Sequence, residues 1–195
     1  MEACKETKTK IVRRFTGGGA VYHDSGNLNY AISLRKGHPL IPEMNLQSVF
    51  EKLSEGAVEG LQNLGVKAEF QPVNDIQVEG KKVSGAAGSI RWNAVFHHGC
   101  ILVGSDLSIL GKVLNVPQVK LEDRHVASVQ KRVTTVRDEL GRDVSTSEVR
   151  DAIVDGIESC YGVGVEPGVL TREELGMAEE LYQTKYSRLE WNLEP

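Results

Sequence analysis

A run of three glycines close to the start of the chain places the strongest constraint on its local fold. Gly17, Gly18 and Gly19 lie in the segment RRFTGGGAVYHDSGNLNY, which begins at Arg13. Three successive glycines do not help a strand or a helix, because each loses much conformational entropy and packs no side chain. They do let backbone N–H groups approach a ligand closely, and phosphate or carboxylate oxygens are the usual ligands of such a nest. The run predicts an anion site, with a structural glycine-rich hairpin or bulge as the alternative.

Two arginines, Arg13 and Arg14, precede the glycines and favour the anion interpretation. Their guanidinium groups are planar, permanently charged donors that match phosphate and carboxylate oxygens. The segment differs from a Walker loop, since no Gly-Lys-Ser/Thr sequence follows, and it lacks the GxGxxG spacing of dinucleotide-binding folds. The predicted anion site therefore belongs to neither of these common nucleotide-binding classes.

The bulk composition is that of an ordinary globular protein of 195 residues, with 40% hydrophobic and 26% charged residues. The net charge of -4 argues against a nucleic-acid partner held by bulk charge. The sequence has no apolar run long enough to span a bilayer and no signal-peptide pattern. Cys4, Cys100 and Cys160 form no CxxC pair, so we expect reduced thiols in a cytoplasmic protein rather than a disulfide framework or a zinc site.

Hydrophobic periodicity predicts strands mainly in the first half of the chain and helices mainly in the second. Strands are expected at residues 10–16, 20–22, 28–34, 67–71, 75–78, 82–84 and 93–103. Helices are expected at residues 45–64, 107–114, 145–161 and 171–184, with Asn45, Ser145 and Thr171 as caps. We expect a single domain of mixed α and β structure rather than regular βαβ units.

A second cluster of polar residues lies in NDIQVEGKKVSGAAG, residues 74–88. Asp75 stands in a predicted strand and offers an oxygen ligand suited to Mg²⁺. Lys82 follows a tight turn and precedes small residues that leave space beside its chain. A lysine in that setting can hold a developing negative charge on a phosphate or an acyl carboxylate. The alternative is a hairpin with two solvated lysines.

A third cluster, FHHGCILV, lies within a predicted strand. His97 and His98 are adjacent, so they point to opposite faces and cannot easily bind one metal ion together. A hydrogen-bonded structural histidine is the alternative to a catalytic one. Cys100 shares a face with His98, which raises the possibility of a thiol nucleophile.

In this order, the three segments resemble the lipoate–protein ligase A family. The tail KYSRLEWNL is also similar to the end of the large domain in archaeal-type members. The resemblance implies the biotin/lipoyl protein ligase fold, which is related to the catalytic domains of class II aminoacyl-tRNA synthetases. We therefore expect an α+β fold with a mixed or antiparallel sheet flanked by helices.

The reaction that the resemblance implies is a two-step acyl transfer. Lipoate and Mg-ATP give lipoyl-adenylate and pyrophosphate, and a lysine of an acceptor domain then attacks the mixed anhydride. The first step brings an anionic carboxylate against a polyanionic phosphate. Cationic side chains and backbone donors must therefore offset their repulsion.

The resemblance also assigns roles to the residues of the three segments. Lys82 is the expected catalytic residue, holding the α-phosphate and the acyl oxygen, and Asp75 is the expected magnesium ligand. The residues expected to bind ATP or lipoyl-AMP are Arg14, Gly17, Gly18, Gly19, Ala20, Val21, Tyr22, Asn74 and Lys82. The residues expected to line the lipoate pocket are His23, Ser84, Gly85, His98, Gly99 and Cys100.

Two positions depart from the family pattern. Cys100 stands where many relatives have a small residue or threonine, and Gly88 where many have glutamine. Octanoyl and lipoyl transferases of the same fold use a cysteine nucleophile and no ATP, so a cysteine-dependent transferase is an alternative. Cys100 follows the lysine segment inside a predicted strand, which is not where we expect that nucleophile. A biotin ligase is disfavoured, because the sequence has no GRGRxGR loop.

The sequence is also shorter than is usual for the family. We expect residues 1–195 to form one catalytic large domain that lacks the usual N-terminal segment and the C-terminal accessory domain. A ligase that is active only with an accessory chain is one alternative, and a non-catalytic subunit that binds lipoate or a lipoyl domain is another. The acceptors implied are 2-oxoacid dehydrogenase E2 lipoyl domains and the glycine cleavage H protein, with no membrane or nucleic-acid partner.

Overall fold

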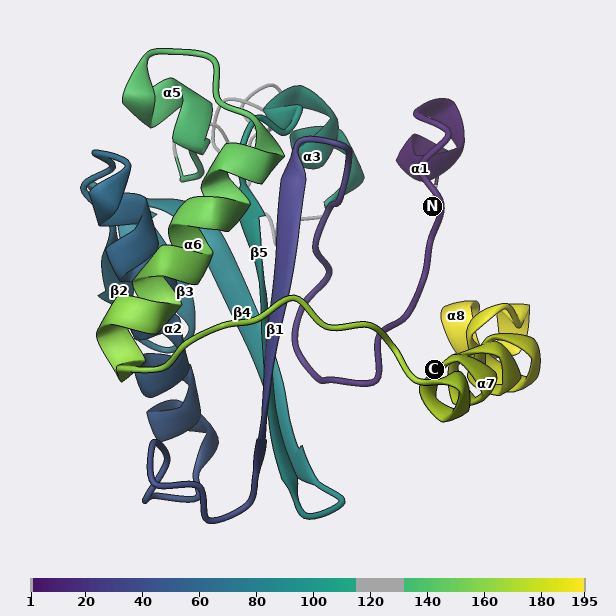
Figure 1. The fold of residues 1–195 in the computed structure, drawn as a ribbon. Helices are drawn as coiled ribbons and strands as arrows, with labels where there is room; N and C mark the ends of the chain where they lie inside the picture. The colour runs from purple at the N-terminus through teal and green to yellow at the C-terminus, as the bar shows by residue number, and fades with distance from the viewer. Residues whose placement is uncertain (1, 115–131, 195) are drawn as a thin grey trace. The chain divides into compact units, whose positions relative to one another are not determined.

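The computed structural model of the chain describes residues 2–114 and 132–194, and its contacts divide the chain into two compact units (Figure 1). The larger unit comprises Thr16–Gly164, and the smaller one combines Met1–Phe15 with Val165–Pro195. The sheet lies in the larger unit, while segments from both ends of the chain form the smaller one.

A five-stranded antiparallel sheet forms the centre of the larger unit, with the strand order β1-β5-β4-β3-β2. The strands are β1 (Asn27–Arg35), β2 (Glu69–Gln71), β3 (Asp75–Val78), β4 (Lys81–Arg91) and β5 (Ala94–Leu102). The antiparallel sheet with its flanking helices confirms the expected α+β fold.

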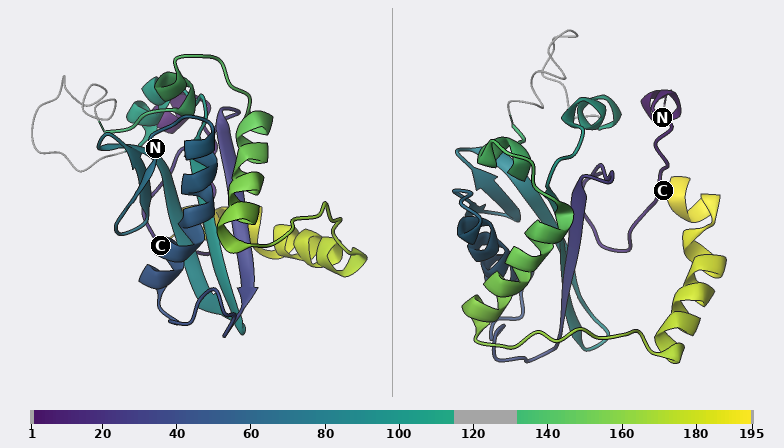
Figure 2. Two further views of the ribbon diagram at one scale, coloured as in Figure 1. Left: turned by 60° about the vertical axis from the view of Figure 1, so that its left-hand side comes forward. Right: turned by 45° about the horizontal axis from the view of Figure 1, so that its top comes forward.

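Two long helices, α2 and α6, pack against each other and lie on one side of the sheet in every view (Figures 1 and 2). The helices of the larger unit are α2 (Leu46–Asn63), α3 (Leu107–Val113), α5 (Val136–Leu140) and α6 (Thr146–Tyr161). The main core lies between α2, α6 and the sheet. Its fully buried members include Leu61, Val83, Ile101, Val136 and Val149.

The two long helices start at the caps that the sequence predicts. The side chain of Asn45 accepts a hydrogen bond from Ser48 N, and that of Ser145 accepts one from Glu148 N. Each cap satisfies a backbone donor that the first turn of a helix leaves without a partner.

The alternation of side chains along β5 divides the sheet into two chemically different faces. Val95, His97 and Ile101 are fully buried against the helices. His98 and Cys100 are partly buried on the opposite face, which we call the site face. The two adjacent histidines therefore point to opposite faces, as predicted.

The smaller unit contains the helices α1 (Glu2–Glu6), α7 (Arg172–Leu181) and α8 (Leu189–Leu193). A π-helical turn, Tyr182–Tyr186, continues α7. The cap predicted at Thr171 is present and forms a capping box at the start of α7, because Thr171 and Glu174 each hydrogen-bond the backbone of the other.

Two of the expected strands are wrong. Residues 10–16 and 20–22 join no ladder among the described residues, since no neighbouring strand accepts their backbone hydrogen bonds. In contrast, the short strand expected at residues 82–84 continues to Arg91, because β5 pairs with it along this length. The helices α5 and α8 were not predicted. Across residues 2–114 and 132–194, no helix has the length and apolar character that a membrane span requires.

Candidate functional site

The ammonium group of Lys82 lies on the site face, 2.5 Å from Asp75 Oδ1 on the neighbouring strand β3. The space for this ammonium exists because residue 85 is glycine. A Cβ on Gly85 would meet Lys82 Nζ at 2.6 Å, well inside van der Waals contact. The Lys82 and Asp75 side chains remain 38% and 27% exposed. The structure thus presents a lysine ammonium over bare backbone, with donors that can reach an approaching anion.

The backbone of Lys82 is held by a segment that is distant in sequence. Lys82 N donates to Arg132 O at 2.8 Å, and Thr134 N donates to Lys82 O at 2.9 Å. These bonds form a short parallel bridge to Val133. On the other side of Lys82, the register between β3 and β4 shifts, and such irregularities re-aim side chains. Both features accompany the placement of Lys82 on the site face.

Asn74, which was expected at the nucleotide, ties the start of β3 to β4. Asn74 Nδ2 donates to Ala86 O at 2.5 Å, and Ala86 N donates to Asn74 O at 2.8 Å. The amide nitrogen of Asn74 is therefore engaged with backbone. The two bonds join the residues next to Asp75 and Gly85, which stand opposite each other in the ladder between β3 and β4.

His98 and Cys100 lie on β5, next to the lysine–aspartate pair. The register pairs Cys100 with Gly85 and His98 with Ala87, so only small β4 residues stand directly opposite them. Thr16 Oγ1 and His98 Nε2 share a hydrogen bond of 2.8 Å, and Thr16 is only 8% exposed. This bond attaches the start of the glycine segment to the site face.

Two residues expected in the lipoate pocket do not belong to the site face. Ser84 is buried and pairs with Ile76 and Ile101 of the main core. Gly99 pairs with Tyr30 on the same helix-covered face. Neither residue therefore offers a side chain to a ligand on the site face.

His97 directly precedes His98 in the sequence and lies on the helix-covered face of the sheet. It is fully buried against the rings of Tyr30 and Phe50, and its Nε2 lies 3.4 Å from Ser54 Oγ. Burial, with a smaller contribution from the neighbouring His98, lowers the pKa of His97 to about 4. The His97 imidazole is consequently neutral near pH 7 and belongs to the core.

The glycines form an irregular loop at the start of the larger unit. Gly18 has a φ of 109°, a conformation that residues with a side chain rarely adopt. A Cβ on Gly17 or Gly19 would meet none of the described atoms within 4 Å, and Ala20 and Val21 are exposed. Packing within the described chain does not require glycine at positions 17 and 19. This agrees with a loop that leaves room for a ligand.

Tyr22 anchors the far end of this loop. Its ring packs in a small cluster with Leu102 and Leu110 and is 8% exposed. Burial, and then the charges of Asp24 and Asp106, raise the pKa of Tyr22. The phenol is therefore neutral near pH 7.

The His-Asp pair that follows Tyr22 divides into an exposed residue and a structural one. His23 is exposed. Asp24 Oδ1 accepts from Gly26 N at 2.8 Å, and Asp24 Oδ2 accepts from Asp106 N at 2.9 Å. Asp24 therefore fastens the turn before β1 to the start of α3.

Arg14 belongs to the smaller unit, where α8 holds the backbone of its neighbour Arg13. Arg13 N donates to Asn192 Oδ1 at 2.8 Å, and Trp191 Nε1 donates to Arg13 O at 2.8 Å. Lys185 Nζ lies 3.9 Å from the centroid of the Trp191 ring, in a cation–π contact. The tail KYSRLEWNL thus holds the backbone of Arg13, the residue before Arg14.

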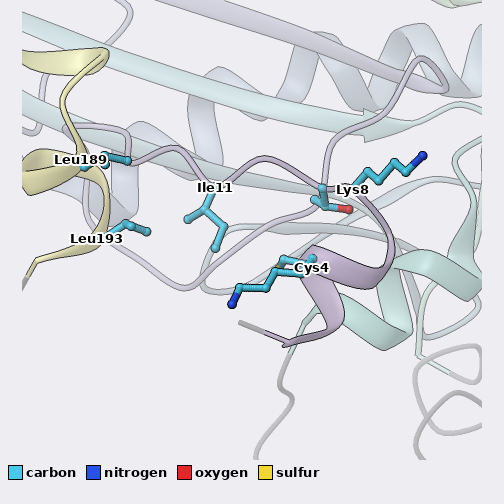
Figure 3. Close-up of a pocket in the computed structure, with 7 residues that line it drawn as sticks. Cys4, Lys8, Ile11, Leu189 and Leu193 are labelled. Carbon is cyan, nitrogen blue, oxygen red and sulfur yellow. The ribbon is translucent and has the colours of Figure 1, made fainter.

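A hollow of about 370 Å³ also lies within the smaller unit (Figure 3). It is lined by Cys4, Lys5, Lys8, Thr9, Ile11, Leu189 and Leu193. Figure 3 shows Ile11 between the leucines of α8 and the helix that carries Cys4. No residue predicted for the site lines this hollow, so it adds no group to the predicted chemistry.

Two features of the site leave no recognisable signal in the sequence. Thr16 lies inside the glycine segment, but nothing in the sequence connects it with His98, 82 positions away. The backbone of residues 132–134 supports Lys82, yet a pairing of so few residues leaves no periodic pattern.

The carboxylate of Asp75 fits a magnesium ion that is shared with a phosphate substrate. Mg²⁺ in nucleotide sites is commonly held by one or two carboxylates together with substrate phosphates and water. Asp75 offers one such carboxylate beside Lys82. No group of three or more His, Cys, Asp or Glu side chains that could hold a metal by itself occurs in the described part of the chain.

Residues 1–158 match the family described as Lipoyl protein ligase A/B catalytic domain. The chain is 35% identical to Lipoate-protein ligase A subunit 1 of Thermoplasma acidophilum over 203 residues, covering 99% of this chain and 75% of that protein. It is 32% identical to Octanoyltransferase LipM of Brevibacillus brevis, covering 94% of this chain and 74% of that protein.

Two solved structures share the fold over 98% of the chain. One is a bi-partite lipoate protein ligase with its E2 lipoyl domain from Thermoplasma acidophilum, with a TM-score of 0.87, 36% identity and 73% of that chain covered. The other is a lipoate-protein ligase A bound with ATP, with a TM-score of 0.84, 35% identity and 74% of that chain covered.

Proposed function

Because the chain belongs to the Lipoyl protein ligase A/B catalytic domain family, we propose that it is a lipoate–protein ligase. It activates lipoate with Mg-ATP and transfers the lipoyl group to a lysine of an acceptor domain. One observation carries the proposal. The Lys82 ammonium lies over Gly85 and beside Asp75 on the site face, where both charged side chains remain partly exposed.

In the first step, a lipoate carboxylate oxygen attacks the α-phosphorus of ATP, and pyrophosphate leaves. The two anions repel each other, so the step needs fixed positive charge where they meet. Lys82 donates to the α-phosphate and the acyl oxygen, and the Gly17–Gly19 loop supplies backbone donors. Arg14 contacts a phosphate of the nucleotide. Residues of α8 hold the backbone of the preceding residue, Arg13.

In the second step, the amine of the acceptor lysine attacks the acyl carbon of lipoyl-adenylate. A lipoyl amide forms, AMP leaves, and the amine gives up a proton. Lys82 stabilises charge on the departing phosphate, while His98 and Cys100 border the acyl group on the site face. When bound at Asp75, Mg²⁺ would neutralise phosphate charge.

The acceptors follow from the same proposal. We assign lipoyl domains of 2-oxoacid dehydrogenase E2 chains and the glycine cleavage H protein, with an accessory chain where the isolated protein is inactive. The bi-partite Thermoplasma ligase supports a requirement for such a chain. We further propose that residues 1–195 act as one catalytic domain, located in the cytoplasm.

The exchange of labelled pyrophosphate into ATP tests the activation step. With lipoate and Mg-ATP present, we expect exchange by the chain alone or after addition of a bi-partite ligase's accessory chain. Exchange must depend on lipoate, because only lipoyl-adenylate formation releases pyrophosphate reversibly. An absence of exchange under both conditions would contradict the ligase and favour a lipoate-binding subunit without activation chemistry.

A cysteine-dependent transferase is the second candidate, favoured by Cys100 on the site face and by the similarity to Octanoyltransferase LipM. The variant Cys100→Ser separates the two functions. A ligase should keep its exchange rate within about twofold, because its chemistry needs no thiol. A thiol-dependent transferase should lose acyl transfer from an acylated carrier protein, and transfer without ATP in the original chain would identify it.

A further inference from the structure

The end of the site face opposite to Lys82 carries a group of cationic side chains with an exposed tryptophan. Arg35 ends β1, and Arg91 ends β4. Both pair with Ala94 of β5, so the two arginines flank a small residue on one face. Lys36 and Trp92 follow them in sequence. We call Arg35, Lys36, Arg91 and Trp92 the basic patch. The end of β1 and the turn between β4 and β5, which carry these residues, lie at the lower end of the sheet in Figure 1.

The three cations of the basic patch are exposed, and none forms an ion pair within residues 2–114 and 132–194. This clustering runs against the net charge of -4 for the chain. The positive charge of the patch is therefore open to a negatively charged partner.

Trp92 adds an apolar anchor in a conformation that its own side chain disfavours. It lies in the two-residue turn between β4 and β5 with a φ of 51°, and Asn93 follows with a φ of 60°. Turns with two positive φ values favour Asn and Gly, and a bulky residue there is an outlier. The side chain is 82% exposed. Lys36 N donates to Asn93 O at 2.9 Å, which fastens this turn beside the end of β1.

We propose that the basic patch is the docking surface for an acidic face of the lipoyl-acceptor domain, an inference that rests on the proposed function. The span fits. From Cys100 to Ala94, β5 advances six residues, or about 20 Å. A compact domain of about 100 residues has a radius of gyration of about 13 Å. One acceptor domain can therefore touch the patch while its lysine reaches the acyl group beside Lys82.

The two kinds of side chain have different tasks in this docking. The cations attract and orient the acidic acceptor, so their contribution weakens as salt screens them. Trp92 supplies buried apolar area at the contact, which is the usual role of tryptophan in protein interfaces. Neither task touches the activation of lipoate, which involves no acceptor.

The test measures the two half-reactions separately. Pyrophosphate exchange reports activation, with the accessory chain added if the original protein needs it. Transfer from preformed lipoyl-adenylate to an apo E2 lipoyl domain gives the KM for the acceptor. For the double variant Arg35→Glu/Arg91→Glu, we expect the acceptor KM to rise about 10-fold or more at low salt, with a flatter salt dependence. For Trp92→Asn, which suits the turn, we expect a rise of about 5-fold in the acceptor KM.

The matched control is Lys67→Glu, which reverses an exposed charge at a distant position, before β2. It should leave the acceptor KM within twofold.

Normal exchange with an unchanged acceptor KM in both patch variants would overturn the docking surface and leave the ligase function standing. Reduced exchange in the patch variants would also overturn it, since the patch would then serve activation or folding. If the patch variants changed the sedimentation coefficient of the protein but not the acceptor KM, the patch would serve self-association, and the docking proposal would be overturned. Loss of exchange in the original protein, by contrast, would remove the proposed function itself.

Discussion

The two faces of the sheet differ in what their side chains do, and the adjacent residues His97 and His98 mark the difference. His97 is fully buried against α2, where aromatic rings surround it. His98 is only partly buried and shares a hydrogen bond with Thr16 at the start of the glycine segment. One face therefore supplies most of the burial that stabilises the fold, and the other exposes polar groups over small residues.

One strand of this sheet therefore serves stability on one face and chemistry on the other. Because successive residues of β5 alternate between the faces, a single substitution should affect one property much more than the other. Changes on the helix-covered face should lower the free energy of unfolding. Removal of the Lys82 ammonium from the site face should lower the rate of lipoate activation and leave the unfolding free energy nearly unchanged.

The largest effect is expected for Lys82→Ala. Removal of the ammonium leaves the repulsion between lipoate and ATP uncompensated, so pyrophosphate exchange should fall about 100- to 1,000-fold. The free energy of unfolding should change by less than about 1 kcal/mol, since the lost ion pair with Asp75 is partly exposed. Exchange kinetics and urea unfolding measure the two quantities. An exchange rate close to that of the original protein would remove the role assigned to Lys82.

A core substitution provides the opposite control for this experiment. Leu53→Ala deletes a fully buried side chain of α2 and should cost about 2–5 kcal/mol of unfolding free energy. Exchange per folded molecule should stay unchanged. If Leu53→Ala and Lys82→Ala had the same profile, the functional separation of the two faces would be refuted.

A smaller effect is expected from the protonation of His97. Its pKa is about 4 in the folded protein, below the value of about 6.5 for an unfolded chain. The unfolded state therefore binds a proton first, and stability should fall as the pH drops from 6.5 toward 4. The loss amounts to about 3 kcal/mol by pH 4.

The variant His97→Met isolates this contribution, because methionine fills a similar volume and carries no titrating group. Urea unfolding between pH 7 and pH 4 should show a shallower loss of stability for the variant than for the original protein. Parallel curves for the two proteins would mean that His97 does not titrate in this way. Absolute stabilities matter less here than the slopes, since methionine also changes the packing.

The smallest effect concerns the bond between Thr16 and His98. Thr16→Val preserves the shape of the side chain but removes its hydroxyl, and one hydrogen bond contributes about 1 kcal/mol. A glycine loop that is less well held should raise the KM for ATP about fivefold, measured by exchange at several ATP concentrations. Thr16→Ser retains the hydroxyl and should restore the KM. Equal KM values in all three proteins would show that the bond does not position the loop.

Much of the fold was predictable because its signals are local. The caps Asn45, Ser145 and Thr171 mark the starts of three helices, and each bond that they make lies within three residues. The opposite orientation of His97 and His98 was predictable for the same reason, since neighbouring side chains of a strand alternate between the two faces of the sheet. The predicted strand at residues 10–16 failed, because a strand needs a neighbour and no local pattern states whether one exists.

The order of the residues is enough to identify the family, the residues that carry charge and the positions where glycine removes side chains. Where these groups are held depends on how the elements pack. Trp191 and Asn192 bind the backbone of Arg13 from the far end of the chain, and residues 132–134 bind that of Lys82. Such contacts are single hydrogen bonds between distant segments, which the packing of whole elements brings together. They leave no periodic trace in the order of the residues.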